Sequence, residues 1–140
     1  MKSYEFIEHT ADIIIRAYGD NLEEAFASAA TALFDLLTGG TQRECKQKVE
    51  LEVEAVDIEG LLVNFLSELI VMHEVENMVF KDFEVTLLDT TSLKAVAWGE
   101  KFSQSKHGGG ISVKAATYHM IEIVDNKGQE PSFVQILFDV

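Results

Sequence analysis

Close to residue 50, apolar and acidic residues alternate with a period of two, and this pattern constrains the fold more than any other feature of the sequence. Four apolar residues lie at every second position, at Val49, Leu51, Val53 and Ala55. The positions between them carry Glu50, Glu52 and Glu54. Because successive side chains of a strand point to opposite faces of its sheet, the pattern predicts a strand with one buried face and one acidic, solvent-facing side.

Two other segments place apolar residues at helical spacing. The first follows Asn21, which predicts a capping-box-like start with Glu24 three residues later, and it ends at Gly39-Gly40. The second follows Asp57, another good cap. Its apolar stripe consists of Leu61, Leu62, Phe65, Leu66, Leu69, Ile70 and His73. Both predicted helices are amphipathic and therefore need a surface that covers their apolar side.

The rest of the chain favours strands, beginning with the β-branched run Ile13-Ile14-Ile15. Strands are predicted over residues 4–7, 12–18, 79–88, 93–102, 112–124 and 132–140. Turn segments between consecutive strands predict mostly antiparallel pairing. We therefore expect an α+β fold of two layers, a mostly antiparallel sheet with the two amphipathic helices packed on one face. The length of 140 residues fits a single domain over residues 1–140.

The charge balance narrows the classes of partner. Eleven basic and 24 acidic residues give a net charge of −13. Such a surface repels phosphate backbones, so we expect no tight direct binding to nucleic acid. The same field attracts a basic protein or a metal cation, and partners are expected in those two classes.

Targeting and redox features are few. No segment reaches the roughly 18 uninterrupted apolar residues of a membrane span. The N-terminal segment passes directly into polar and acidic positions without the pattern of a secretory signal, so we expect a cytoplasmic protein with no membrane partner. Cys45 is the only cysteine, which excludes an intramolecular disulfide and a thiolate zinc cluster.

The two ends of the sequence carry the strongest candidate site. Asp12 begins one predicted strand, and Asp139 with the carboxylate of Val140 ends another. A sheet that paired these strands would gather the carboxylates, and clustered carboxylates bind hard divalent cations. Local sequence also allows blander roles, because Asp12 could cap a turn or pair with a lysine and a chain end often frays. Against fraying, the last predicted strand is strongly apolar and should be docked to its end.

Other candidate residues lie in the segment 112–124. Lys114 and Tyr118 are predicted on one face of a strand, where the lysine could neutralise the carboxylates or meet a phosphate, or could equally be solvated at a sheet edge. His107 precedes three glycines, a pattern that favours a flexible connection over a phosphate-binding loop. The four histidines fit no zinc signature, and no serine lies in a nucleophile elbow.

Six segments, taken in order, resemble the archease family over nearly the full length of the chain. They are Phe6-Ile7-Glu8-His9-Thr10-Ala11-Asp12, Ala17-Tyr18-Gly19-Asp20 with Leu22-Glu23-Glu24-Ala25-Phe26, Leu61-Leu62-Val63-Asn64-Phe65-Leu66-Ser67-Glu68-Leu69, Trp98-Gly99-Glu100, Val113-Lys114-Ala115-Ala116-Thr117-Tyr118-His119, and Phe138-Asp139-Val140. The sequence departs from the family pattern at Asn64-Phe65, where an acidic or aromatic pair is expected.

The resemblance implies a role in tRNA processing. It implies a non-enzymatic activator of the tRNA-splicing RNA ligase, which joins 3′-phosphate and 5′-hydroxyl ends after taking GMP from GTP onto a histidine. The partner would be that ligase, with GTP and RNA reached through it. The resemblance also implies that Asp12, Asp139 and Val140 bind a divalent cation, which is calcium, magnesium or manganese. Lys114, Tyr118 and His9 are further candidate functional residues.

Two other classes of function stay open from the sequence. The first is a metal-dependent phosphohydrolase that uses the same carboxylates to activate water, although no general base is evident. The second is a non-catalytic interaction module with solvated acidic ends.

Overall fold

The segments with strand and helix patterns form the elements expected of them. The computed structural model describes residues 2–8 and 12–140. The strands are β1 (Ser3–Glu8), β2 (Asp12–Gly19), β3 (Gln47–Glu54), β4 (Met78–Asp89), β5 (Ser92–Lys101), β6 (Ala115–Val124) and β7 (Ser132–Asp139). The helices are α1 (Leu22–Thr38), α2 (Ile58–Glu76) and the short α3 (Gln104–His107).

The predicted caps begin both long helices and end the first of them. Asn21 Oδ1 accepts the Glu24 N–H at 2.9 Å, and Glu24 Oε1 accepts the Asp20 N–H at 2.9 Å. Asp57 Oδ1 accepts the Gly60 N–H at 2.7 Å at the start of α2. Gly39 ends α1 in the left-handed region, at φ 71°, which glycine adopts without a Cβ penalty. Local sequence therefore sets the start of both helices and the end of α1.

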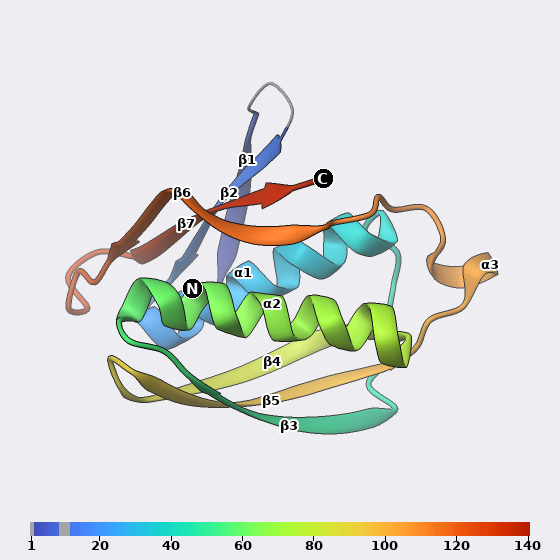
Figure 1. Cartoon of the computed structure of the whole chain (residues 1–140), viewed down its shortest axis with the longest axis horizontal. Helices are drawn as coiled ribbons and strands as arrows, with labels where there is room; N and C mark the ends of the chain where they lie inside the picture. Colours follow the sequence, from blue (N-terminus) through green and yellow to red (C-terminus); the bar gives the residue numbers. More distant parts are fainter. Residues whose placement is uncertain (1, 9–11) are drawn as a thin grey trace.

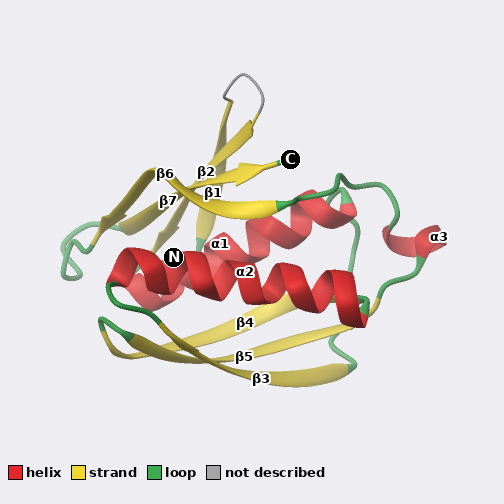
Figure 2. Cartoon of the chain, in the orientation of Figure 1, coloured by secondary structure: helices red, strands yellow, loops and turns green. Residues whose placement is uncertain are grey.

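The strands divide between two antiparallel sheets (Figure 1). One sheet has the order β1-β2-β7-β6, and the other has the order β3-β5-β4. Figure 2 shows both long helices lying between the sheets. The prediction of an α+β fold with antiparallel strands is thus confirmed.

The layering differs from the single sheet that we expected, because the helices are covered on two sides. On one side of α1, the Phe34 ring lies 5.4 Å from the Phe80 ring and 5.9 Å from the Phe83 ring of β4. Towards the other sheet, Ser28 Oγ donates to the Tyr18 carbonyl of β2 at 2.8 Å. Small residues such as Ala29 leave room for both approaches. An apolar stripe predicts that a helix is covered but does not say by how many sheets.

Candidate functional site

The first and last residues of two neighbouring strands meet at one end of the four-stranded sheet. β2 and β7 pair antiparallel, and Asp12 lies directly opposite Asp139 in their register. Val140 follows at the end of β7, where its side chain is half-buried against the core. The tail of the chain is therefore docked, as its apolar composition predicts.

Backbone directions show how closely the two aspartates face each other. The Lys114 N–H donates to the Asp139 carbonyl at 2.8 Å, and Thr117 Oγ1 donates to the Leu137 carbonyl at 3.0 Å. Both carbonyls of β7 thus point to β6, so Asp12 and Asp139 form a non-hydrogen-bonded pair across β2 and β7. Side chains in such pairs are the closer ones, with Cβ atoms about 4.5–5.5 Å apart.

The electrostatic setting of this pair is repulsive. Asp12 is half-buried and Asp139 is exposed. Over residues 2–8 and 12–140, no lysine, arginine or histidine side chain forms an ion pair with either carboxylate. Like charges placed directly opposite each other destabilise a sheet. A bound cation would remove this repulsion.

The residues present fit a small oxygen-ligand site. Two carboxylates on adjacent strands share one face, and the backbone of Val140 continues directly from Asp139. Calcium, magnesium and manganese all accept carboxylate and water oxygens. Within the part of the chain that the structure describes, no three His, Cys, Asp or Glu side chains gather as a metal site. The set that the structure shows is therefore two side-chain carboxylates, one on each of two neighbouring strands.

The structure places Lys114 and Tyr118, the two candidates predicted on one strand, in different surroundings. Lys114 is exposed and lies immediately before β6, not in the middle of a strand as predicted, and its backbone is bonded to Asp139. Tyr118 lies further along β6, next to an irregularity in pairing between Thr117 and Glu122. Its hydroxyl lies beside Gly60, in the first turn of α2. Lys114 thus adjoins the aspartate pair, whereas Tyr118 does not.

His9, the remaining candidate, lies outside the described residues.

A buried carboxylate that the sequence analysis did not single out lies elsewhere in the fold. Glu100 at the end of β5 is 6% exposed, and one oxygen accepts hydrogen bonds from Lys106 Nζ at 2.8 Å and the Glu44 N–H at 2.9 Å. The same oxygen contacts His107 Nε2 at 3.0 Å. Burial by itself raises the pKa of Glu100, but the bonds from Lys106, Glu44 and His107 outweigh it and lower the pKa to about 2.

The bond pattern also assigns the state of His107, which is fully buried. The Ser103 N–H donates to Nδ1 at 2.9 Å, so Nδ1 carries no proton and Nε2 donates to Glu100. The segment that the sequence predicted as a flexible connection is therefore held by a buried side chain and contains α3. In the sequence, the only signal for this site was an acidic residue, Glu100, followed by the basic residues Lys106 and His107. Their contact depends on the path of the segment between them, which the sequence does not specify.

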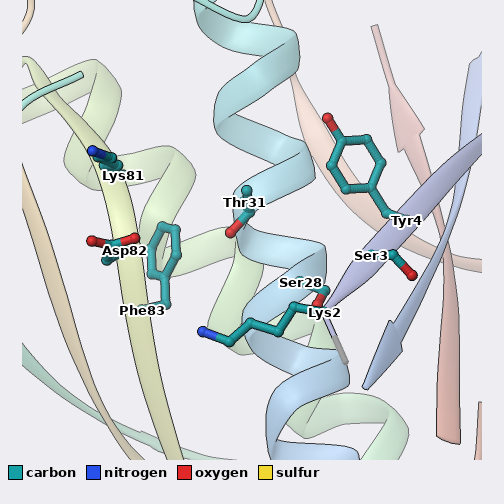
Figure 3. A pocket seen from close by; sticks show the side chains of 8 residues that line it. All are labelled: Lys2, Ser3, Tyr4, Ser28, Thr31, Lys81, Asp82 and Phe83. Atoms are coloured by element: carbon teal, nitrogen blue, oxygen red, sulfur yellow. The ribbon is translucent and has the colours of Figure 1, made fainter. Parts of the chain in front are cut away.

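A separate hollow of about 450 Å³ lies between β1, α1 and β4. Figure 3 shows that Lys2 crosses in front of α1 toward Phe83, with Lys81 and Asp82 on β4 and Tyr4 on β1. This hollow contains none of the predicted site residues. Its charges are mixed, and it gives no specific chemistry.

A family model and known proteins match this chain over most of its length. A model of the Archease protein family (MTH1598/TM1083) matches residues 4–140. The chain belongs to the archease family. Protein archease of Pyrococcus abyssi is 52% identical over 126 residues, which span 88% of this chain and 89% of that relative. Protein archease of Sulfurisphaera tokodaii is 44% identical over 129 residues, spanning 91% of this chain and 92% of the relative.

Solved archease-like structures share the architecture. The solution structure of Methanobacterium thermoautotrophicum protein 1598 has a TM-score of 0.74 and 33% identity, and the match covers 98% of each chain. The crystal structure of a Thermotoga maritima archease, described as a possible chaperone, has a TM-score of 0.62 at 18% identity and covers 96% of this chain and 94% of that one. The second likeness concerns the fold alone.

No helix in the described ranges is long and apolar enough to cross a membrane.

Proposed function

We propose that this archease activates the tRNA-splicing RNA ligase and is not itself an enzyme. In this proposal it promotes the transfer of GMP from GTP to the ligase and allows repeated turnover, in the cytoplasm. Membership of the archease family supports the class of function. The pairing of Asp12 with Asp139 is the single observation that supports the proposed site.

The proposed site holds a divalent cation between the two chain ends. Asp12, Asp139 and the carboxylate of Val140 would supply oxygen ligands, and the cation would supply positive charge where phosphate oxygens gather. The two aspartates are held by neighbouring strands of one sheet, so they need no rearrangement to present their oxygens on one face. Such preorganised groups are effective because charge and position decide most of phosphoryl-type transfer.

Lys114 extends this site toward a phosphate-bearing partner. Its backbone N–H donates to the Asp139 carbonyl, so this exposed lysine lies at the strand end that carries Asp139. An ammonium there can meet a phosphate of GTP or RNA held by the ligase. The net charge of −13 would steer the whole protein to a basic cleft and would keep it from binding free RNA tightly.

The test is a guanylylation assay of the cognate ligase with manganese and GTP. Asp12→Asn should abolish stimulation because it removes one carboxylate from the pair. Glu130→Gln is the matched control, since it removes one exposed negative charge just before the start of β7, at the other end of this strand from Asp139. Full stimulation by Asp12→Asn would exclude the carboxylate pair from the function.

Two further measurements separate the remaining alternatives. Turnover of GTP or cyclic-phosphate RNA by the isolated chain with manganese would show an enzyme instead of an activator. One glycine added after Val140 converts its carboxylate to an amide, so weaker calcium binding in calorimetry would support Val140 as the third ligand.

A further inference from the structure

Among the strands that the structure describes, none pairs with the outer edge of β3 in the second sheet, and this edge faces a groove away from the aspartate pair. β3 is an edge strand, and it runs beside α2 (Figure 1). The groove between them has a volume of about 350 Å³. Its lining combines three residues of β3 with four residues at helical spacing on α2, which are Glu52, Val53, Glu54, Asn64, Ser67, Glu68 and Val71.

The register of β3 shows which backbone groups face the groove. The Ala55 N–H donates to the Thr91 carbonyl at 2.9 Å, which makes the odd-numbered residues of β3 the ones that bond to β5. Glu50, Glu52 and Glu54 therefore point their N–H and carbonyl groups away from the sheet. Asn64 Nδ2 on α2 satisfies the Glu54 carbonyl at 2.9 Å. That bond gives a structural use to the residue at which the sequence departs from the family pattern.

Apart from Asn64, the lining of the groove combines acidic side chains with one exposed apolar side chain. Glu52, Glu54 and Glu68 are the charged residues of its lining. Val71, 50% exposed on α2, adds an apolar surface at the same groove. Across the sheet face, Glu52 has one ion pair, with Lys94 at 3.7 Å, in which both side chains are mostly exposed.

We propose that this groove binds an extended, basic segment of a partner protein as an additional antiparallel strand beside β3. The outward N–H groups of Glu50, Glu52 and Glu54 and the carbonyls of Glu50 and Glu52 supply the pairing, as in other complexes formed by strand addition. Lysine or arginine at alternate positions would lie opposite the glutamates, and apolar residues between them would face Val71. A second copy of this chain is the poorer occupant, because pairing β3 with β3 would place glutamates beside glutamates.

The test uses a fluorescent seven-residue peptide in which lysine alternates with valine, and its binding is followed by anisotropy. Val71→Lys should weaken binding at least tenfold because it removes the apolar contact and adds a like charge. Leu88→Lys is the matched control, since Leu88 is 55% exposed, lies on β4 outside the groove and undergoes the same change in charge. That control should bind within twofold of the unmodified protein.

Backbone methylation of the peptide separates strand pairing from simple charge attraction. In antiparallel pairing opposite the outward-facing glutamates, the lysine amides point to β3 and the valine amides point away. N-methylation of the lysine amides should therefore weaken binding at least tenfold more than N-methylation of the valine amides. Equal effects of the two modifications would overturn the proposal.

Two other results would also overturn it. The first is equal weakening by Val71→Lys and Leu88→Lys, which would mean that net charge alone governs binding. The second is a dimer in sedimentation that Val71→Lys dissociates, which would make a second copy the occupant. If Val71→Lys does not fold, the comparison of Glu68→Gln with Glu74→Gln replaces it, because both remove an exposed charge of α2 and only Glu68 lines the groove.

Discussion

Two regions of this molecule place carboxylates in opposite environments. At Glu100 one buried carboxylate is surrounded by donors from Lys106, His107 and the Glu44 backbone. At Asp12 and Asp139 two carboxylates face each other, and no cationic side chain in the described parts of the chain pairs with them. A carboxylate satisfied by its own chain stabilises the fold, whereas a pair left without counter-charge is available to a ligand. The groups around the carboxylates, and not the residue type, distinguish the two regions.

The largest expected effect is the loss of the buried acid. Glu100→Ala would leave His107 Nε2–H and the Glu44 N–H without their acceptor, and groups left unpaired in this way cost about 3 kcal/mol of the free energy of unfolding. Urea unfolding monitored by circular dichroism measures the loss. Glu84→Ala, at an exposed position of β4, is the control and should change the free energy of unfolding by less than about 0.5 kcal/mol. A loss below about 1 kcal/mol in Glu100→Ala would contradict a stabilising role.

The next effect is a loss of stability in acid. The pKa of Glu100 falls from 4.5 to about 2 on folding, so its contribution is fully present above pH 4.5 and disappears as the pH falls through 2. The difference in pKa corresponds to about 3 kcal/mol. Unfolding of the wild type and Glu100→Gln at each pH isolates this contribution from other carboxylates. Parallel curves for the two proteins between pH 4.5 and 2 would contradict the assignment.

A smaller effect is expected from metal at the aspartate pair. Calcium at 5 mM, added after chelation, should raise the free energy of unfolding by about 1.4 kcal/mol for a dissociation constant of roughly 0.5 mM. Thermal unfolding with and without the ion measures the change. Asp12→Asn should remove most of it, while Glu100→Gln should retain it. The same increase in Asp12→Asn would place any bound ion elsewhere.

The smallest effect concerns repulsion within the pair. With divalent ions removed, Asp139→Asn should stabilise the protein by about 0.5 kcal/mol at low salt, since it removes a like charge opposite Asp12. The gain should shrink at 0.15 M salt, because exposed charges are then screened. Chemical unfolding at two salt concentrations measures both values. Destabilisation at low salt would show that the carboxylates do not repel each other.

Particular residues show how far the sequence could be interpreted alone. Asn21 and Asp57 identified the helix starts because an N-cap acts on the next three residues. Asp12 and the apolar tail predicted a docked chain end, and the register places Asp12 opposite Asp139. The role of Glu100 was missed, because its donors come from a loop whose path no local pattern specifies. The proposed cation and the ligase remain predictions.

The sequence by itself determined the elements, their caps and the amphipathic faces, because these depend on side chains within a few positions of one another. Only the tertiary structure decided that the strands form two sheets with the helices between them. The tertiary structure also decided which carboxylates meet a donor and which meet each other. Contacts between distant segments depend on register and on the direction of backbone groups, and both are set by packing of the whole chain.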